Sequence, residues 1–476
     1  MATRTPTKTQ QVIVGMATEQ GVVPVGILQV DRSMTGDRDT SLGRFKYAPS
    51  YLKRPDAVAL DPIKLPLTDG EFRFASMGGL PSAIRDSAPD NWGRLLIRRY
   101  FYAREIEGPL YEVDYLLAAP RDRSGNLHFA TGFKSDGTPD WDRHAIEPEA
   151  LPEAEALGQL VRTVLKDPVG QFGKAYPKEL DALLTASGGA RPKVNLVARN
   201  GTYLIKMGAP GQDTTSNARL EDASIRMAKQ VGIDVASVGA RPNGAEPDML
   251  TVKRFDRDGT RKLQMVSAMT VLGADDDAYK RTNWSYPLLA QQLDRWSSEP
   301  AKDKEQLFRC MVLRAMLSDG DDHPRNYALI RDPNSVTNQG RGGSTLGQWR
   351  LSPMYDCVVG RGEGRKESAL AMNIGRMGRE ISEENILSQC SAFGLSTDRA
   401  AAIMAEIQQA VLTQFPKVLQ ACGVSEADAQ LSLRAVAPLN DRAQESFVQR
   451  LVARMEQRQH EAADAQGDHN QPAPRG

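Results

Sequence analysis

The chain has 476 residues, of which 60 are lysine or arginine and 60 are aspartate or glutamate, so its formal net charge is zero. This length allows two or three domains with sizeable cores. The balanced charge excludes the overall basic surface that is typical of a dedicated nucleic-acid-binding protein. The four cysteines have neither metal-ligand nor disulfide spacing, which favours a reducing compartment.

Targeting and membrane signals are not evident in the sequence. The start of the chain lacks the apolar core of a signal peptide. No uncharged apolar run approaches the ~20 residues that span a bilayer. We therefore expect a globular, cytoplasmic protein without a membrane partner.

Residues 1–150 predict an amino-terminal α/β subdomain. Short β-rich runs at residues 11–14, 22–30 and 45–51 are separated by glycine and turn residues, which indicates strands. A helix is expected from Pro89 to Glu105, where apolar residues recur at helical spacing. Residues 121–142 are rich in Gly, Asp and Pro and are expected to form loops.

Residues 151–256 predict a second, mixed unit. Helices are expected at residues 152–165 and 176–186, and strands at 194–198 and 202–207 with a hairpin turn at Asn200-Gly201. A helix at residues 220–231 ends at Gly232, and another strand follows at 249–255. This order of strand, strand, helix and strand is that of a protein-kinase small lobe, with residues 253–256 as the hinge.

Residues 257–458 predict a helical large lobe. Helices are expected at residues 286–296, 304–317, 383–393, 398–415 and 443–458, with a strand at 327–330. Residues 459–476 are polar and without pattern, so we predict a disordered tail. The whole is predicted to be an α+β protein with a two-lobed, protein-kinase-like fold: a small mixed lobe, an all-α large lobe and the amino-terminal α/β subdomain.

Two acidic segments carry the strongest chemical signal. Residues 319–326 read Asp-Gly-Asp-Asp-His-Pro-Arg-Asn, and residues 351–356 read Leu-Ser-Pro-Met-Tyr-Asp. Protein kinases place an Asn five residues after the catalytic Asp and bring a second metal-binding Asp later. Asp321 is therefore the candidate base, with Asn326 and Asp356 as Mg²⁺ ligands. An acidic surface turn is the alternative, but Asp356 ends an apolar segment, where a charge needs a partner.

Four further residues have two interpretations each. His323 is either a phosphate contact or an ordinary loop residue, and Asp319 either binds a second cation or caps the preceding helix. Lys206 lies among apolar residues, which suits a phosphate-binding lysine or an outward-facing strand lysine. Glu221 is either its ion-pair partner or a favourable charge at a helix start.

A glycine-rich segment precedes the first strand of the second unit. Residues 187–193 read Ser-Gly-Gly-Ala-Arg-Pro-Lys, so Gly188, Gly189 and Ala190 allow the backbone to approach phosphate closely. The spacing of a Walker loop is absent. The segment is therefore predicted to be a flexible phosphate cover.

Taken together, these motifs resemble the HipA family, the serine/threonine-kinase toxins of bacterial type II toxin–antitoxin pairs, over about residues 10–440. The segments similar to those of the family are Arg85-Asp-Ser-Ala-Pro-Asp-Asn-Trp-Gly-Arg94, Gly189-Ala-Arg-Pro-Lys193, Ile205-Lys206, Lys253-Arg-Phe-Asp-Arg257, and the two acidic segments.

The resemblance implies a role for each matching residue. Asp321 is implied as catalytic base, and Asn326 and Asp356 as metal ligands. The implied ATP-binding residues are Gly188, Gly189, Ala190, Lys193, Lys206, Lys253, Phe255, His323 and Tyr355. Two departures stand out. Ala186 aligns with the regulatory serine of many relatives, so the loop is either not phosphorylated or is modified at Ser187, with Thr185 as the second choice. Residues 265–270 lack the usual acidic pattern.

The sequence thus predicts an ATP- and Mg²⁺-dependent serine/threonine protein kinase that acts as a growth-inhibiting toxin. The resemblance implies a helix-turn-helix, HipB-like antitoxin that carries the pair to operator DNA, and a protein substrate such as a translation factor or an aminoacyl-tRNA synthetase. One alternative is a catalytically silent, kinase-like co-repressor subunit. The other is a kinase for a small molecule.

Overall fold

The computed structural model describes residues 2–3, 9–89, 91–146, 154–167, 171–175, 180, 183, 191–208, 216–244, 246–274, 281–331, 345–360 and 369–436. Within these ranges the chain contains both antiparallel sheets and a helical bundle, so the predicted α+β class is confirmed. No helix among the described residues is long and apolar enough to cross a membrane.

The amino-terminal domain is built on a five-stranded antiparallel sheet in the order β7-β6-β3-β2-β9. Its strands are β2 (Thr9–Thr18), β3 (Gly21–Asp31), β6 (Leu42–Tyr47), β7 (Glu71–Phe74) and β9 (Leu127–Ala130). Every second residue along β2 and β3 enters the core, as Val12, Val14, Leu28 and Val30 do, because strand side chains alternate between faces.

Short strands and helices complete this domain. The shorter elements are β1 (Ala2–Thr3), β4 (Met34–Thr35), β5 (Arg38–Asp39), α1 (Pro49–Leu52), η1 (Met77–Gly79), α2 (Ser82–Arg85), α3 (Asn91–Ala103), β8 (Ile106–Glu107) and α4 (Glu112–Ala118). Trp92 and Leu96 of α3 are buried in one core cluster with Val194 and Ile205 of the second unit. The amino-terminal domain therefore shares its core with the unit that follows it.

The small lobe contains a four-stranded antiparallel sheet in the order β10-β11-β13-β12. Its elements are α5 (Ala154–Lys166), α6 (Phe172–Ala175), β10 (Lys193–Ala198), β11 (Gly201–Met207), α8 (Asn217–Gln230), β12 (Val238–Asn243) and β13 (Glu246–Lys253). Ser216 caps α8 by accepting a hydrogen bond from the backbone N–H of Arg219. Gly232, with φ +75°, follows the helix end as predicted.

The large lobe combines helices with a small sheet. Its elements are β14 (Arg257–Asp258), β15 (Arg261–Lys262), β16 (Met265–Ser267), α9 (Ala268–Leu272), η2 (Arg281–Asn283), α10 (Tyr286–Trp296), α11 (Pro300–Met316), η3 (Pro324–Asn326), β17 (Ala328–Arg331), β18 (Trp349–Leu351), α12 (Glu383–Leu387), η4 (Cys390–Phe393), α13 (Thr397–Ala421) and α14 (Glu426–Ala435). Strands β16, β17 and β18 form one antiparallel sheet. The sequence had predicted an all-α large lobe, and this sheet shows that the prediction was wrong.

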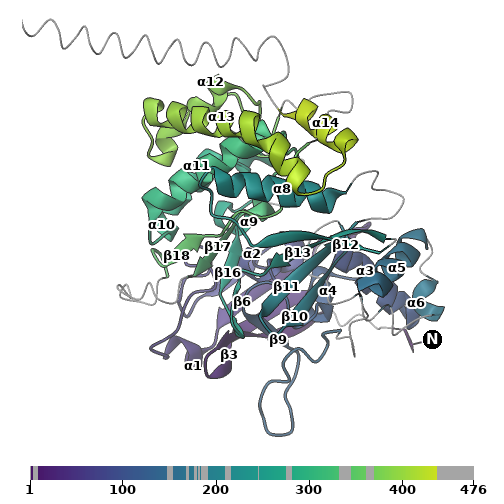
Figure 1. Ribbon diagram of the computed structural model, residues 1–476. Helices are drawn as coiled ribbons and strands as arrows, with labels where there is room; N and C mark the ends of the chain where they lie inside the picture. The colour runs from purple at the N-terminus through teal and green to yellow at the C-terminus, as the bar shows by residue number, and fades with distance from the viewer. Residues whose placement is uncertain are drawn as a thin grey trace, which may run out of the picture.

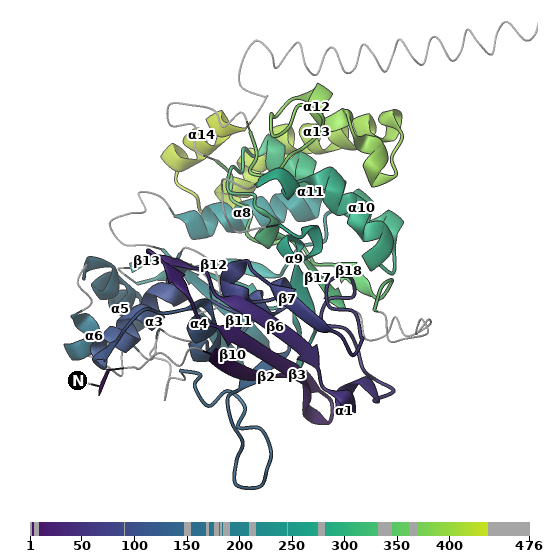
Figure 2. The ribbon, with the colours of Figure 1, turned by 180° about the vertical axis from the view of Figure 1, so that it is seen from behind.

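Figure 1 shows how these parts are stacked. The helices α11, α13 and α14 lie in the upper part of the molecule, α8 lies beneath α13 and α14, and α10 lies lower, to the left. Both large sheets lie in the lower part of the molecule. Figure 2 shows the molecule from behind, where the strands of the amino-terminal sheet face the viewer. Helix α8 packs against both α13 and the small-lobe strands β12 and β13.

Four local predictions were wrong, and in one of them, β9, a strand far along the chain decides the structure. Residues 49–52 form α1 rather than the end of a strand, and residues 127–130 form β9, which pairs with β2, rather than a loop. The predicted helix at 383–393 is divided into α12 and η4. The hairpin turn lies one residue earlier than predicted, because Ala198 pairs with Gly201. The expected helices at 176–186 and 443–458 and the tail lie outside the described residues, except for residues 180 and 183.

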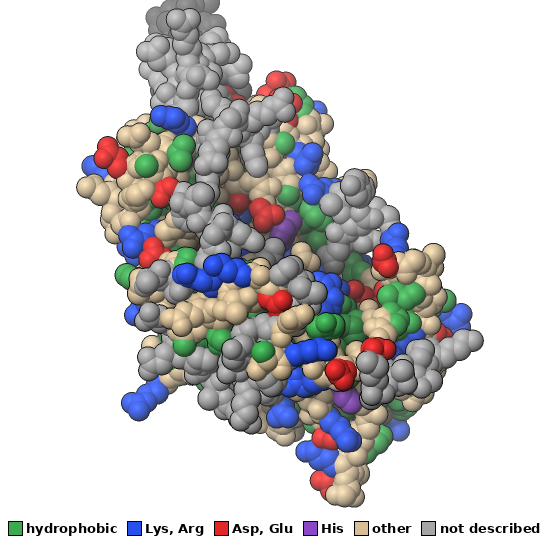
Figure 3. Space-filling view, turned by 90° about the vertical axis from the view of Figure 1, so that its right-hand side faces the viewer, with side chains coloured by type: hydrophobic (Ala, Val, Ile, Leu, Met, Phe, Trp, Pro, Cys, Tyr) green, Lys and Arg blue, Asp and Glu red, His purple; other side chains and the backbone are tan. Residues whose placement is uncertain are grey.

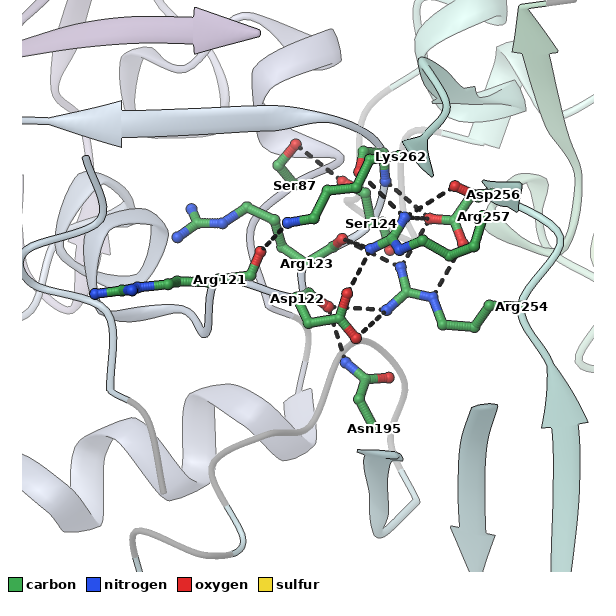
Figure 4. Close-up of polar contacts among 11 residues, drawn as sticks. Ser87, Arg121, Asp122, Arg123, Ser124, Asn195, Arg254, Asp256, Arg257 and Lys262 are labelled. Carbon is green, nitrogen blue, oxygen red and sulfur yellow. Dashed lines mark hydrogen bonds and ion pairs between the residues drawn. The ribbon is translucent and has the colours of Figure 1, made fainter. Parts of the chain in front are cut away.

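A network of charged side chains joins the hinge to the amino-terminal domain (Figure 4). Arg254 donates to the carbonyl oxygens of Asp122, at 2.8 Å, and of Arg123, at 3.1 Å. Arg257 donates to the Asp122 carboxylate at 2.7 Å, and the buried Asp256 accepts from Arg254 at 2.7 Å. The hinge segment is thus held by the loop that precedes β9.

We expect Asp256→Asn to destabilise the protein in a pH-dependent manner. Burial alone would raise the pKa of Asp256, but the charges of Arg254 and Arg257 outweigh it and lower the pKa to about 2. Because the folded-state pKa lies below the unfolded-state value, the stabilisation is present above about pH 4 and is lost as pH falls towards 2. The loss at pH 7 should be about 2 kcal/mol, measured by urea unfolding at several pH values.

The matched control is Asp258→Asn, since Asp258 forms an exposed ion pair with Arg261 and such pairs contribute little. A loss in Asp256→Asn that is equally large at pH 7 and pH 3 would contradict the electrostatic explanation.

A second stability prediction concerns the contact between β6 and η1. A Cβ atom at Gly43 would overlap the carbonyl oxygen of Gly79, so Gly43→Ala must push the two segments apart. Overpacking of this kind typically costs ~1–3 kcal/mol, and we expect a lower midpoint of thermal unfolding. Gly132→Ala is the control, because a Cβ there meets no atom within 4 Å. Equal midpoints for the two variants would refute the prediction.

Candidate functional site

A cavity of about 1360 Å³ lies where the small lobe, the large lobe and the amino-terminal domain meet. Figure 3 shows this side of the molecule hollowed between its upper and lower parts, with acidic, basic and histidine side chains gathered along the hollow. The described residues that were predicted for the site all line this one cavity: Lys193, Lys206, Lys253, Phe255, Asp321, His323, Asn326, Tyr355 and Asp356. The remaining predicted residues, Ser187, Gly188, Gly189 and Ala190, lie outside the described residues.

Lys206 is the centre of the charge arrangement in the cavity. Its ammonium group lies 2.6 Å from Glu221 Oε1 and 2.6 Å from Asp356 Oδ1. The strand β11 carries the lysine and α8 carries the glutamate, so the ion pair joins the sheet to its helix. The predicted partner Glu221 is thereby confirmed, and the outward-facing alternative for Lys206 is wrong.

Lys206 and Asp356 shift each other's pKa values. Burial would lower the pKa of Lys206, but the carboxylates of Asp356 and Glu221 outweigh burial and raise it. Burial would likewise raise the pKa of Asp356, whereas the positive charges of Lys206 and Lys193 lower it. Both groups are consequently charged over the whole physiological range of pH.

The loop at residues 319–326 lies beside Asp356. Asn326 is buried, and its amide nitrogen donates to the carbonyl oxygens of Asp321, at 3.0 Å, and of Asp356, at 3.4 Å. Asp321 itself is exposed at the cavity. Among the described residues, the buried Nδ1 atom of His323 has no hydrogen-bond partner, so it could accept or donate a hydrogen bond to a molecule in the cavity.

Two aromatic rings form another part of the cavity. The rings of Phe255, from the hinge, and Tyr355 have centroids 5.1 Å apart. The Tyr355 hydroxyl donates to the carbonyl oxygen of Arg325 at 2.6 Å, which holds this ring against the loop at residues 319–326. With Leu204 and Val252 on the same wall, these rings provide an apolar surface of the kind on which a nucleotide base packs.

Arg314 of α11 is the residue of this site that sequence reasoning missed. Its guanidinium group is fully buried and donates to the carbonyl oxygens of Tyr355, at 2.7 Å, and of Asp356, at 2.9 Å. It also contacts Asp319 at 2.5 Å and Asp322 at 3.4 Å. The signal in the sequence was an arginine within the otherwise apolar run of residues 310–317, since a buried charge requires partners.

The contact with Arg314 changes the interpretation of Asp319. Burial raises the pKa of Asp319 to about 6 even though the Arg314 charge opposes that shift. The carboxyl group of Asp319 is directed at this buried guanidinium, so Asp319 helps to hold the loop in place.

The side-chain oxygens of Asn326 and Asp356 are of the kind that bind a magnesium ion together with phosphate. Among the described residues, no three His, Cys, Asp or Glu side chains are grouped so that they could hold a metal by themselves. Mg²⁺ in phosphoryl-transfer sites takes one or two protein oxygens and completes its shell with substrate phosphates and water. The side-chain oxygens of Asn326 and Asp356 match that requirement.

Two family models match the chain. The HipA N-terminal domain matches residues 24–130, and the HipA-like C-terminal domain matches residues 185–415, so together they cover well over half of the sequence. The chain belongs to the HipA family. The second of these matches contains all the described site residues named above, and the first contains the 85–94 signature segment.

One solved structure has the same fold over nearly the whole chain. HipA of Shewanella oneidensis, determined with HipB and its operator DNA, is 16% identical and superposes with a TM-score of 0.61 over 92% of this chain and 99% of that chain. At this identity the likeness shows the fold alone, and it confirms the predicted HipA-like architecture. The Helicobacter pylori proinflammatory kinase CtkA is 13% identical, with a TM-score of 0.40, covering 55% of this chain and 94% of that chain.

One curated protein is similar over part of the HipA-family sequence. A Haemophilus influenzae protein named "Putative kinase" is 25% identical over 193 residues, which are 36% of this chain and 51% of that protein. The chain thus spans about half the length of this curated relative.

We expect Arg314→Met to be strongly destabilising. Removal of the guanidinium would leave Asp319 and Asp322 buried without their cation, and breaking a buried pair from one side typically costs about 3–5 kcal/mol. The measurement is the free energy of unfolding in urea. Arg73→Met is the control, because Arg73 forms an exposed pair with Glu71. Similar stabilities for the two variants would show that Arg314 does not organise the loops.

Proposed function

We propose that this HipA-family protein is an ATP- and Mg²⁺-dependent serine/threonine protein kinase. The observation that carries the proposal is the contact of Lys206 with Asp356, at 2.6 Å, in the cavity that Asp321 and Asn326 also line. Protein kinases use this arrangement on a triphosphate: a lysine paired with a helix glutamate, beside a metal-binding aspartate.

Each side chain would have a distinct role. Lys206, held by Glu221, would bind the α- and β-phosphates of ATP, and the unpartnered His323 Nδ1 would face the phosphate chain. Asn326 and Asp356 would hold Mg²⁺, which would neutralise phosphate charge. The rings of Phe255 and Tyr355 would pack against the base.

Asp321 would act as general base. The exposed carboxylate would accept the proton of a serine or threonine hydroxyl while that oxygen forms a bond to the γ-phosphorus and ADP leaves. Its position at the cavity surface allows a side chain of another protein to approach. Substrate recognition would then depend on the surface around the cavity mouth.

The biological role that we propose is that of the toxin in a toxin–antitoxin pair. The Shewanella relative was solved with HipB and operator DNA, which supports a HipB-like, helix-turn-helix antitoxin as partner. The zero net charge of this chain suits an arrangement in which the antitoxin makes most phosphate contacts. The family resemblance suggests a translation factor or an aminoacyl-tRNA synthetase as the protein substrate.

The decisive variant is Asp321→Asn. It removes the base but keeps the side-chain shape, so phosphate transfer should fall at least ~10²-fold, the usual scale for general acid–base catalysis. The measurement is transfer of labelled γ-phosphate to protein, with ATP binding and thermal unfolding followed in parallel. The control is Asp69→Asn, which alters a carboxylate that is 88% exposed on the amino-terminal domain.

Each result distinguishes the proposal from its alternatives. Full transfer by a folded Asp321→Asn protein would refute the assignment of the base. ATP binding by the wild type without transfer to any protein or small molecule would favour the silent co-repressor. Transfer only to small molecules would favour a metabolite kinase.

A further inference from the structure

The signature segment at residues 85–94 has no role in the reaction described above, yet it lines the same cavity. Its second residue, Asp86, directly follows α2 and is the C-cap residue of that helix. The Asp86 side chain is only 6% exposed. All the hydrogen bonds that reach it come from the large lobe rather than from its own domain.

The contacts of Asp86 are numerous for one carboxyl group. Oδ1 accepts from the hydroxyl of Ser267 at 2.6 Å, and Oδ2 accepts from the backbone N–H of Ser267 at 2.7 Å and from the hydroxyl of Thr270 at 2.7 Å. The guanidinium of Arg325 lies 3.6 Å from Oδ1. Hydrogen bonds to a carboxylate are short and strong, so this set fixes Asp86 against the large lobe.

These partners are parts of the catalytic loop and of its immediate support. Arg325 lies within the loop, between His323 and Asn326, and its carbonyl oxygen accepts from Tyr355. Ser267 ends β16 and pairs with Ala328, which follows the loop in β17. The next residue, Ala268, donates to the carbonyl oxygen of Tyr327 at 2.8 Å. Asp86 therefore reaches the residues on both sides of Asn326: Arg325 directly, and Tyr327 and Ala328 through Ser267 and Ala268.

We propose that Asp86 is a positioning residue for phosphoryl transfer, through which the amino-terminal domain fixes the catalytic loop. The inference rests on the proposed kinase function. A displacement of about 1 Å in a reacting group can reduce a rate ~10²-fold, and residues that orient catalytic groups typically contribute about 10–100-fold. The amino-terminal domain is thus a component of the active site without touching the nucleotide.

The test compares Asp86→Asn with Asp56→Asn. The first variant keeps one acceptor oxygen but places an amide NH₂ against the donors of Ser267 or Thr270. The second alters a carboxylate whose ion-pair partner, Arg54, belongs to the same domain. We expect Asp86→Asn to lower kcat at saturating ATP at least ~10-fold, with the KM for ATP within twofold, because Lys206 and Phe255 are untouched. Asp56→Asn should match the wild type.

A readout that does not depend on kinase activity separates this inference from the proposed function. Amide hydrogen exchange at His323 and Asn326, whose N–H groups donate within the loop at 2.9 and 2.8 Å, should be faster in Asp86→Asn. Exchange along β10 and β11 should stay unchanged. Faster loop exchange together with an inactive wild type would show that Asp86 fixes the loop but would refute both the kinase and the role in phosphoryl transfer.

Thr270→Val alters the same contact from the side of the large lobe. It is the variant to test if the Asp86→Asn protein does not fold. It removes one donor from a buried site with little change of shape. It should reduce kcat in the same direction, and the double variant should lose less than the two single effects combined. Wild-type kcat and wild-type loop exchange in a folded Asp86→Asn or Thr270→Val protein would overturn the inference.

Discussion

The constraint on which the rest of the site depends is the accumulation of acidic groups in one partly buried volume. Two basic residues, Lys206 and Arg314, compensate this acidity. The carboxyl groups concerned are those of Glu221, Asp319, Asp321, Asp322 and Asp356. Desolvated carboxylates repel one another unless cations intervene. Lys206 connects the small lobe to Asp356, and Arg314 connects α11 to the loops on either side, so the charge compensation also fixes the relative positions of the two lobes.

The amino-terminal domain belongs to the same mechanical unit. It shares one buried cluster with the small lobe through α3, and its loop at residues 121–125 holds the hinge arginines. Asp86 adds a third attachment, to Ser267 and to Arg325 of the loop at residues 319–326. These attachments reach the small lobe, the hinge and the large lobe in turn. A domain bonded to all three parts limits how far the lobes can separate, which favours a site that is organised before substrate arrives.

The sequence allowed prediction where the signal was local in the chain. The spacing of Asp321 and Asn326, the apolar context of Lys206 and the end of the helix at Gly232 each depend on neighbouring residues, and the structure places them as expected. Two of the failures have the opposite property. The strand β9 exists because β2 offers it an edge more than 100 residues away, and Arg314 matters through carbonyl groups about 40 positions later. Such pairings leave no periodic trace in a single sequence.

Two residues beside the charged cluster, Ser318 and Asp356, have strained backbone conformations that surrounding hydrogen bonds maintain. Ser318 and Asp356 both have positive φ, 51° and 52°, a conformation that costs non-glycine residues about 1 kcal/mol. Arg314 and Asn326 hold the carbonyl group of Asp356, and the Ser318 hydroxyl donates to the carbonyl oxygen of Ala435 at the end of α14 at 2.5 Å. Hydrogen bonds from Arg314 of α11 and from Asn326 of the loop at residues 319–326 therefore offset the free-energy cost of the strained backbone at Asp356. The same bonds direct its carboxylate towards Lys206, so the residue that would bind the metal is oriented by the large lobe before any ligand enters.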